Sequence, residues 1–508
     1  MRVSTKLRTM DARLEVIFLK YPMLIITGTY WGDEGKGKIV DLLSKLYKLA
    51  IRYSGGSGAG HTLVTPDLKK FIGHLIPCGI ARLVHCVLGR GVFFDLKRFL
   101  DELKEAKRVF GKKLPPIWVD KNSPLWTPWH GLIEQWLEHS MGKKKVGTTG
   151  KAIGPLAGLK ALRMGPKVLH LYQKDRALRI RLQGLYRALK PCFDEMVRLK
   201  LVKRKDVPRP IHVERALLKD APKIEQYVTD TARGLAKAFA AKVRMLFEGA
   251  QAPGLDIELG TWPYVSSGNS VAAGAPLGTG LPLKAFAKAV VLMVMKALPT
   301  RVGAGPFPSE IWDREECEQW ALNNAKLFKK RYKKMRLAFL REKLELINYG
   351  TPTKADWAQY FQVLGYELGA TTGRGRSIGW MDVQWLWYVI RVNGPDWFAL
   401  TRFDMLSGLK QVPVVVGYKL DGKEIEPGEM PNTDDMFRIV PIIEMWDCWD
   451  EDITGICDFN ELPYKAKKFV WRLEKLLRVP ILLIGTGPGR NEVIVRPAAE
   501  KKTFPVAA

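Results

Sequence analysis

Short apolar runs alternate with glycine-rich turns and amphipathic stretches along most of this chain. Residues 24–27, 49–53 and 244–248 are apolar runs of strand length, and each is followed by a glycine-rich or polar turn. Residues 95–107 have the spacing of an amphipathic helix, and residues 171–241 have a helical pattern with basic polar faces. Repeated strand–loop–helix units with polar residues at the strand ends predict an α/β fold with a large, mainly parallel central sheet flanked by helices.

The turn after the first apolar run has the composition of a phosphate-binding loop. Residues 28–38 read Gly-Thr-Tyr-Trp-Gly-Asp-Glu-Gly-Lys-Gly-Lys. Glycines let backbone N–H groups point into one concavity, the N-terminus of the next helix carries partial positive charge, and a lysine supplies a full charge. The spacing differs from that of the common phosphate-binding loop. Asp33 would repel a phosphate there unless it holds a metal or takes a proton from a substrate.

Basic residues outnumber acidic ones by 81 to 52, which gives a net charge of +29. Such an excess attracts anions of every kind, including nucleotides, nucleic acids and acidic surfaces. Because the sequence contains no recognised nucleic-acid-binding motif, a solvated basic surface is favoured over nucleic-acid binding.

The cysteines and the two ends of the chain indicate a cytoplasmic protein. Six cysteines are scattered without metal-ligand spacing, and no secretory signal precedes them, so we expect reduced thiols. No apolar run approaches membrane-spanning length, and no membrane contact is expected. Residues 1–21 are interpreted as an unstructured or helical N-terminal extension, and residues 497–508 as a C-terminal tail.

Two blocks near the N-terminus together resemble the signature of the adenylosuccinate synthetase family. They are residues 31–38, Trp-Gly-Asp-Glu-Gly-Lys-Gly-Lys, and residues 52–64, Arg-Tyr-Ser-Gly-Gly-Ser-Gly-Ala-Gly-His-Thr-Leu-Val. Further blocks that resemble the family's motifs follow in order at residues 147–155, 244–267, 296–308, 369–382, 397–404 and 479–490. The resemblance implies a P-loop-NTPase-related fold in which residues 22–496 form one catalytic domain, with a basic helical insertion at about residues 314–364.

The resemblance also implies a reaction, in which IMP, L-aspartate and GTP give adenylosuccinate, GDP and phosphate through a 6-phosphoryl-IMP intermediate. Asp33 would take the N1 proton of IMP, and Mg²⁺ would be held by the Asp33 carboxylate and the Gly60 carbonyl. The implied catalytic residues are Asp33, Lys36, His61 and Gln251. The implied IMP-binding residues are Thr149, Arg163, Gln251, Ser266 and Val302, and those for L-aspartate are Thr372, Arg374 and Arg376. The implied GTP-binding residues are Gly32, Glu34, Gly35, Lys36, Gly37, Gly60, His61, Thr62, Arg402, Asp404, Gly485, Gly487 and Pro488. Arg163 would reach the partner's site in a homodimer.

Several positions depart from the family's usual pattern and leave two alternatives open. Residues 57–62 lack an asparagine next to the IMP site, Ser266 replaces a threonine, and Gly485 and Gly489 replace a serine and an aspartate. One alternative is a viral-type relative that condenses dGMP with L-aspartate, sometimes with ATP as the phosphoryl donor. Such relatives tend to lose the aspartate at position 33, so Asp33 favours IMP, and Asp404 favours GTP. The second is a non-catalytic nucleic-acid-binding protein on the same fold.

Two further segments have compositions of their own. Residues 115–140 are rich in Trp and Pro and are expected to form a covering segment. Residues 326–341 have the pattern of a basic amphipathic helix, whose Leu and Phe stripe we expect to pack against the protein itself.

Overall fold

The computed structural model describes residues 2–64, 69–142, 150–301, 303–368 and 375–497. A ten-stranded sheet runs through its centre, and every neighbouring pair is parallel except β17 and β18, which are antiparallel. In spatial order its strands are β18 (Val493–Val495), β17 (Ile481–Gly485), β13 (Trp397–Thr401), β9 (Val290–Lys296), β1 (Met23–Gly28), β8 (Met245–Glu248), β2 (Leu49–Arg52), β5 (His85–Leu88), β6 (Ile117–Asp120) and β7 (Val228–Thr229). The expected large, mainly parallel sheet is confirmed.

The central strands are buried along their whole length, which explains their continuous apolar runs. Every residue of β1, β8 and β13 is buried. Parallel strands covered by helices on both faces have no solvated face, so their sequences need no polar alternation. Charged side chains inside such strands are therefore exceptions that need a partner.

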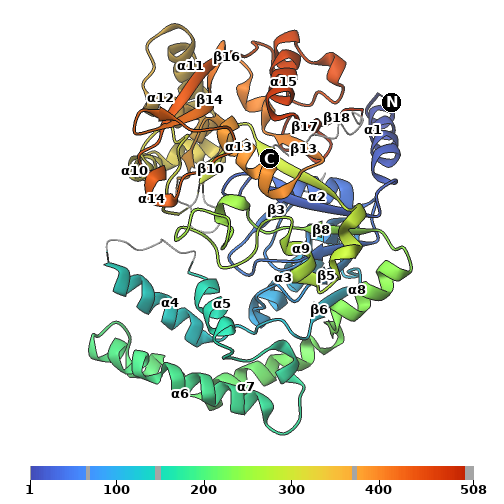
Figure 1. Ribbon diagram of the computed structural model, residues 1–508, viewed down its shortest axis with the longest axis vertical. Helices are drawn as coiled ribbons and strands as arrows, with labels where there is room; N and C mark the ends of the chain where they lie inside the picture. The colour runs from blue at the N-terminus through green and yellow to red at the C-terminus, as the bar shows by residue number, and fades with distance from the viewer. Residues whose placement is uncertain (1, 65–68, 143–149, 302, 369–374, 498–508) are drawn as a thin grey trace.

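Helices pack around the central sheet, and groups of helices lie at both ends of the molecule (Figure 1). Helices α4 to α7 lie together at one end of the molecule, and α10 to α12 lie with α13, α15 and a smaller sheet at the other. The helices are α1 (Arg2–Phe18), α2 (Lys36–Ser44), α3 (Leu96–Phe110), α4 (Pro128–Met141), α5 (Ile153–Ala161), α6 (Ala177–Arg198), α7 (Pro210–Asp220), α8 (Thr231–Ala240), α9 (Gly274–Thr279), α10 (Arg314–Asn323), α11 (Lys333–Tyr349), α12 (Lys354–Gly365), α13 (Val383–Asn393), α14 (Thr433–Met436) and α15 (Tyr464–Leu477).

Three smaller sheets border the central one. In the largest, β14 (Gln411–Leu420) pairs with β12 (Met381–Asp382), β15 (Lys423–Glu424) and β16 (Val440–Asp447). The others are the pairs β3 (His61–Val64) with β4 (Lys70–Gly73), and β10 (Thr300–Arg301) with β11 (Ser377–Ile378). Strands β3 and β11 each lie within a block that resembles a family motif.

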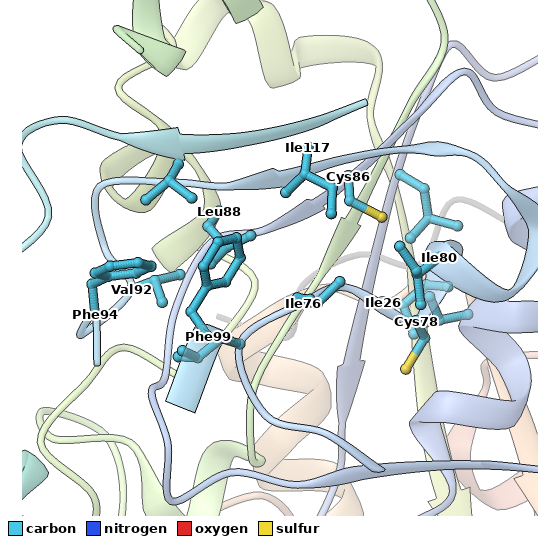
Figure 2. Close-up of a cluster of buried hydrophobic side chains, with 14 of the residues drawn as sticks. Ile26, Ile76, Cys78, Ile80, Cys86, Leu88, Val92, Phe94, Phe99 and Ile117 are labelled. Carbon is cyan, nitrogen blue, oxygen red and sulfur yellow. The ribbon is translucent and has the colours of Figure 1, made fainter. Parts of the chain in front are cut away.

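Two large hydrophobic clusters hold the layers together. One joins β1, β5 and β6 to helices α1, α2, α3 and α6, and Figure 2 shows its part around Ile26, Leu88 and Phe99. The other is rich in aromatic side chains and joins β13 and β17 to α12, α13 and α15. The cysteines are free thiols, as expected, and Cys78 and Cys86 are buried in the first cluster.

Two expectations about the covering segments need correction. Residues 115–140 are not merely a cover, because Ile117–Asp120 forms β6 inside the central sheet, and α4 follows. The basic helix expected over residues 326–341 begins only at Lys333, after two short 3₁₀ turns at Ala325–Phe328 and Lys330–Tyr332. Leu327 in the first turn is buried, so part of the apolar stripe packs inward as expected.

The N-terminal extension is helical and belongs to the core. Leu14 and Phe18 of α1 are fully buried, and the ring of Phe18 packs edge-on against Trp397 of β13. Across the described ranges of the chain, no helix has the length and apolar character needed to cross a membrane.

Candidate active site

The blocks that resemble family motifs meet at one edge of the central sheet. Strands β1, β2, β8 and β13 are mutually parallel through their neighbours, so the turns that follow them emerge at the same edge. The carboxyl edge of a parallel sheet is where ligands bind in open α/β folds. Strand β1 lies between β8 and β9 at the centre of the sheet, so its turn, residues 29–35, lies at the centre of this edge.

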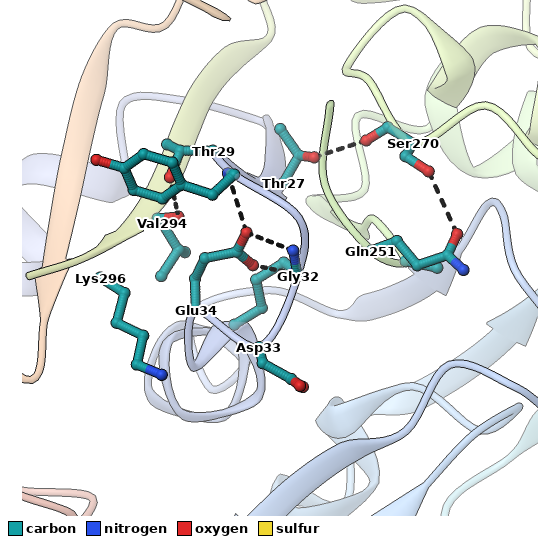
Figure 3. Close-up of polar contacts among 12 residues, drawn as sticks. Thr27, Thr29, Gly32, Asp33, Glu34, Gln251, Ser270, Val294 and Lys296 are labelled. Carbon is teal, nitrogen blue, oxygen red and sulfur yellow. Dashed lines mark hydrogen bonds and ion pairs between the residues drawn. The ribbon is translucent and has the colours of Figure 1, made fainter. Parts of the chain in front are cut away.

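The loop after β1 is braced by Glu34, whose side chain turns inward. Its Oε1 accepts hydrogen bonds from the backbone N–H groups of Tyr30 and Gly32 at 3.1 and 2.9 Å, and its Oε2 lies 2.6 Å from Lys36 Nζ. Glu34 and Lys36 are 1% and 3% exposed, so this ion pair is closed to water. Figure 3 shows Asp33 pointing away from Glu34. Within the loop, Asp33 is thus the carboxylate presented to a ligand.

Backbone conformation explains the glycines of this loop. Gly32 and Gly35 have φ angles of 98° and 85°, and Gly35 caps the N-terminus of α2. Only glycine adopts such angles without strain. Gly37 lies in the first turn of α2, where a Cβ would come 3.0 Å from the backbone oxygen of Thr62. The α2 N-terminus and β3 therefore approach closely, which brings two predicted GTP-binding segments together.

Asp33 forms an ion pair with Arg376, from the block expected to bind L-aspartate. Oδ2 of Asp33 lies 3.0 Å from Nη2 of Arg376, and the two side chains are 34% and 14% exposed. These residues are 343 positions apart in the sequence. The structure therefore brings the expected catalytic base and one expected L-aspartate ligand into contact.

His61 lies beside a buried carboxylate that sequence analysis did not single out. Oε1 of Glu248 lies 2.5 Å from His61 Nδ1 and 2.6 Å from Arg52 Nη1, and Oε2 accepts from the backbone N–H of Cys78. Burial alone would raise the pKa of Glu248, but the His61 hydrogen bond and the Arg52 charge outweigh it and lower this pKa to about 2. Burial and then the Arg52 charge lower the pKa of His61 to about 4.

The same cluster contains three potential metal-ligand atoms, in His61, Cys78 and Glu248, within 4.8 Å of one another. Arg52 already occupies the space between two of them, because its Nη1 lies 2.8 Å from His61 Nδ1. A cation placed there would be repelled by the guanidinium. The cluster is therefore an arrangement that orients His61, and not a metal site.

Lys38 and Thr401 connect the ends of β17 and β13 to the phosphate-type loop and the helix that follows it. Its Nζ donates to the backbone oxygens of Gly487 and Glu492 at 2.6 and 2.9 Å, and burial lowers its pKa to about 8. Thr401 Oγ1 donates to the Glu34 backbone oxygen at 2.6 Å. Lys38 and Thr401 thus attach two sides of the expected base pocket to the loop after β1.

Asp404 provides an unsatisfied acceptor in this pocket. Its Oδ1 is buried and has no hydrogen-bond partner among the described residues, and burial raises the pKa of the carboxyl. The preceding Arg402 has a φ angle of 59°. A buried acceptor without a donor is costly unless a ligand supplies one. Gly485 lies next to Thr401, while Pro488 is exposed.

Three of the expected IMP-binding residues are described, namely Gln251, Ser266 and Arg163. Gln251 has a φ angle of 62° directly after β8, and its Oε1 accepts from Ser270 Oγ at 3.3 Å (Figure 3). Ser266 donates from its hydroxyl to the Leu255 backbone oxygen at 2.9 Å. Arg163 is exposed, with a φ angle of 65°. Four expected ligands lie outside the described residues, namely Thr149, Val302, Thr372 and Arg374.

Five charged residues of this region were missed, because the sequence alone does not show what they pair with. They are Lys38, Arg52, Glu248, Lys296 and Glu367. Arg52, Glu248 and Lys296 each end a buried apolar strand, which was a usable signal, since a charge in such a position needs a partner.

The donor groups expected for Mg²⁺ fit that ion chemically. Mg²⁺ prefers carboxylate and carbonyl oxygens. Asp33 uses Oδ2 for Arg376, and no described residue donates to its other carboxylate oxygen. Gly60 cannot offer more than its backbone, and a Cβ there would come 3.1 Å from His74 Nε2, so the loop passes close to a buried side chain.

Comparisons with known proteins agree over nearly the whole chain. A family model described as adenylosuccinate synthetase matches residues 25–494. The curated adenylosuccinate synthetase of Mycobacterium tuberculosis (strain ATCC 25618 / H37Rv) is 36% identical over 478 residues, covering 94% of this chain and 98% of the relative. That of Mycobacterium marinum (strain ATCC BAA-535 / M) is 37% identical over 479 residues, with the same two coverages of 94% and 98%.

Two solved structures are also similar. The fully ligated adenylosuccinate synthetase from Plasmodium falciparum has a TM-score of 0.75 and 30% identity, covering 93% of this chain and 99% of its own. The succinoaminodeoxyadenylate synthetase of cyanophage S-2L, bound to dGMP and dATP, has a TM-score of 0.52 and 17% identity, covering 93% and 95%. The second likeness concerns the fold alone.

Proposed function

This chain belongs to the adenylosuccinate synthetase family, whose members are ligases that form a C–N bond, and we propose that it converts IMP, L-aspartate and GTP to adenylosuccinate, GDP and phosphate. The observation that carries the proposal is the contact between Asp33 and Arg376 beside the phosphate-type loop. It joins a proton acceptor, a carboxylate-binding guanidinium and a phosphate-binding turn, which are the three groups that this reaction needs.

The chemistry explains why phosphorylation must come first. The oxo group at C6 of a purine is a poor leaving group, so an amine does not displace it unaided. In the proposed reaction Asp33 takes the N1 proton of IMP, and the 6-oxyanion attacks the γ-phosphorus of GTP as the bond to GDP breaks. The amino group of L-aspartate then attacks C6, and the C6–O bond breaks as phosphate leaves. The departing phosphate takes the proton that the amine loses, and the N1 proton held by Asp33 passes to water when the products leave.

The position of each residue in the site suggests its role in the proposed reaction. The N-terminus of α2 would neutralise charge on the phosphates, as phosphoryl transfer requires, and Lys36 would add its charge when it exchanges its contact with Glu34 for a phosphate oxygen. His61 would contact the transferring group through Nε2, because Nδ1 faces Glu248. Gln251 would help to orient IMP. Mg²⁺, held by the Asp33 carboxylate and the Gly60 carbonyl, would supply charge neutralisation when bound.

The proposal for the phosphoryl donor rests on the pocket beyond β13. Guanine presents donors at N1 and N2, and the buried Oδ1 of Asp404 is an acceptor without a donor. Adenine has no donors in that arrangement, so Asp404 supports GTP over ATP. On the acceptor side, the retained Asp33 supports IMP over dGMP, whose 2-amino group would crowd a carboxylate.

We also propose a homodimer in which Arg163 completes the partner's IMP site. Arg163 is exposed, and the neighbouring Leu162 and Met164 are 63% and 41% exposed. Exposed apolar side chains around an arginine are typical of a surface that is covered by another chain. Mixing an Asp33→Asn variant with an Arg163→Leu variant would test this, because activity should return only in hybrid dimers that hold one intact site.

The deciding experiment crosses IMP or dGMP with GTP or ATP in the presence of L-aspartate and Mg²⁺. Phosphate release and product mass are followed for the purified protein. Product from IMP with GTP supports the proposal. Product only from dGMP would mean that the protein instead makes the precursor of 2-aminoadenine nucleotides. No product in any of the four mixtures would favour a non-catalytic binding protein on this fold.

A further inference from the structure

Arg376 belongs to a row of four charged side chains, Asp33, Arg376, Glu367 and Lys296, that runs inward from Asp33. Its Nη1 donates to Glu367 Oε2 at 2.9 Å, and Glu367 Oε1 accepts from Lys296 Nζ at 2.7 Å. Glu367 and Lys296 are 1% and 2% exposed, whereas Asp33 at the outer end is 34% exposed. Charges therefore alternate from the buried end of β9 to the ligand-facing end of the loop after β1.

Backbone contacts fix Glu367 and Arg376, the two middle members of this row of charges. The Arg376 N–H donates to the Glu367 backbone oxygen at 3.0 Å, and Leu368 and Gly375 between them form an antiparallel bridge. Glu367 and Arg376 therefore face each other just outside the Leu368–Gly375 bridge. A Cβ on Gly375 would lie 2.6 Å from Gln362 Nε2 and 2.8 Å from Ala321 Cβ, so helices α10 and α12 press against this base.

Burying the Lys296–Glu367 ion pair in the core is energetically unfavourable compared with burying an apolar pair. Desolvating two charges costs several kcal/mol per ion, and an apolar pair of similar volume is often as stable or more stable. Burial tends to lower the pKa of Lys296 and to raise that of Glu367, but the Lys296 and Arg376 charges lower the Glu367 pKa to about 2, so the carboxylate stays ionised. Its placement needs a reason other than stability.

That reason lies in the part of the guanidinium that has no hydrogen-bond partner within the described ranges. Nη1 of Arg376 is held by Glu367 and Nη2 contacts Asp33, while Nε is buried with no hydrogen-bond partner among the described residues. Nε and Nη2 form one edge of a guanidinium, and such an edge accepts a carboxylate in two parallel hydrogen bonds. An incoming carboxylate could bind Nε and share or replace Asp33 at Nη2.

We propose that Glu367, itself fixed by Lys296, is the positioning residue that aims the Nε–Nη2 edge of Arg376 at the amino-acid substrate while Nη2 contacts Asp33. This inference rests on the proposed function. It gives Glu367 and Lys296 a role in L-aspartate affinity although neither touches the substrate.

Two double variants separate positioning from stability. Lys296→Met with Glu367→Leu removes both buried charges and every acceptor for Arg376 Nη1. Lys296→Met with Glu367→Gln removes the same charges but keeps a side-chain oxygen that can accept from Nη1. The two variants have equal net charge, so a purely structural role for the ion pair predicts equal kinetics. The control is Lys343→Met, which removes the Lys343–Asp356 ion pair (2.5 Å) between α11 and α12, away from the site.

We expect the Leu double variant to fold with a Tm near that of the native protein and to show a KM for L-aspartate raised by about tenfold or more, the scale on which supporting groups act on ligand-binding groups. The KM values for IMP and GTP should stay near native. The Gln double variant should recover much of the L-aspartate affinity, and Lys343→Met should resemble the native protein. Equal, native-like KM values for L-aspartate in both double variants would overturn the inference.

A second readout does not depend on turnover. Phenylglyoxal modifies arginine side chains, and peptide mass spectrometry reports the rate at Arg376. We expect faster modification of Arg376 in the Leu double variant than in the Gln double variant. If the native protein fails to make adenylosuccinate, the proposed function fails. Equal modification rates at Arg376 would then overturn the positioning role as well, and a faster rate in the Leu variant would uphold it for another carboxylate ligand.

Discussion

Nδ1 of His61 and Oε1 of Glu248 lie 2.5 Å apart, although the two residues come from different strands 187 positions apart in the sequence. An ionised carboxylate accepts hydrogen bonds only, so Nδ1 must carry the hydrogen of this contact. Nε2 is then the nitrogen left for a ligand. It can donate to a phosphate oxygen only when the ring is protonated, which an arriving phosphate favours and burial opposes.

This geometry predicts the effect of Glu248→Gln. Removing the charge removes the group that stabilises a protonated His61, so kcat/KM should fall by about 10- to 100-fold. The alkaline limb of the pH–rate profile should move to lower pH, because the protonated ring is lost earlier as pH rises. Steady-state rates across pH check this. A uniform loss without a shift of the limb would mean that Glu248 acts on folding alone.

Asp33→Asn should abolish turnover while the protein stays folded. An amide of the same shape keeps a hydrogen-bond acceptor for Arg376 but cannot take the N1 proton. Asp33 is partly exposed in the loop, so little packing is lost. The measurement is phosphate release together with a melting curve. Turnover near the native rate in a folded Asp33→Asn protein would remove Asp33 from the role of base.

Asp404→Asn should change the choice of nucleotide. The amide offers donors where guanine also has donors, so the KM for GTP should rise by about tenfold or more, in line with 1–3 kcal/mol for an unmade hydrogen bond. Xanthine carries an acceptor at that position and should become the better base. Competing GTP against XTP in one assay measures the switch. An unchanged preference for GTP would place the base elsewhere.

Gly28→Ala should disrupt the loop after β1. A Cβ on Gly28 would lie 2.5 Å from Glu34 Oε2 and 2.8 Å from Ala252 Cβ. Glu34 cannot retreat without releasing the Tyr30 and Gly32 N–H groups and the Lys36 ammonium. We expect lower stability and weaker GTP binding, measured by thermal shift with and without GTP. Gly158→Ala in α5 is a suitable control, because nothing lies within 4 Å of the added methyl.

His130 should make the protein acid-sensitive. Burial lowers its pKa from 6.5 to about 4, so the unfolded chain binds this proton more readily than the folded one. The stabilisation is complete above about pH 6.5, is lost as pH falls toward 4, and amounts to about 3 kcal/mol for a shift of this size.

His130→Gln separates this titration from the structural role of the ring. His130 Nδ1 accepts from the Thr127 N–H at the start of α4, and Gln at that position also completes a capping box. The variant should lose less Tm than the native protein between pH 7 and pH 4.5. The remaining slope comes from His61 and His74, whose pKa values burial also lowers to about 4. An identical slope in both proteins would show that His130 is not the titrating group.

Residue motifs were enough to predict the sheet and to propose residues for the site. The apolar runs that became β1, β2 and β8 are short, continuous and followed by turns, which is the pattern of buried parallel strands. The same reasoning failed for residues 117–120, because the four tryptophans and four prolines of residues 115–140 suggested a covering segment. It also placed the start of α11 too early, since basic residues 326–332 continue the helical spacing but form 3₁₀ turns.

What the sequence by itself determined is the family, and it also suggested candidate acting groups, because the residues of a loop such as 28–38 are contiguous and their chemistry is visible in the local sequence. Only the tertiary structure decided how those groups are supported. Glu248 with His61, and Lys296 with Glu367 and Arg376, meet across strands far apart in the chain. A charged residue at the end of a buried strand predicts that a partner exists. Which residue is the partner depends on the order of strands in the sheet, and the local sequence pattern does not encode that order.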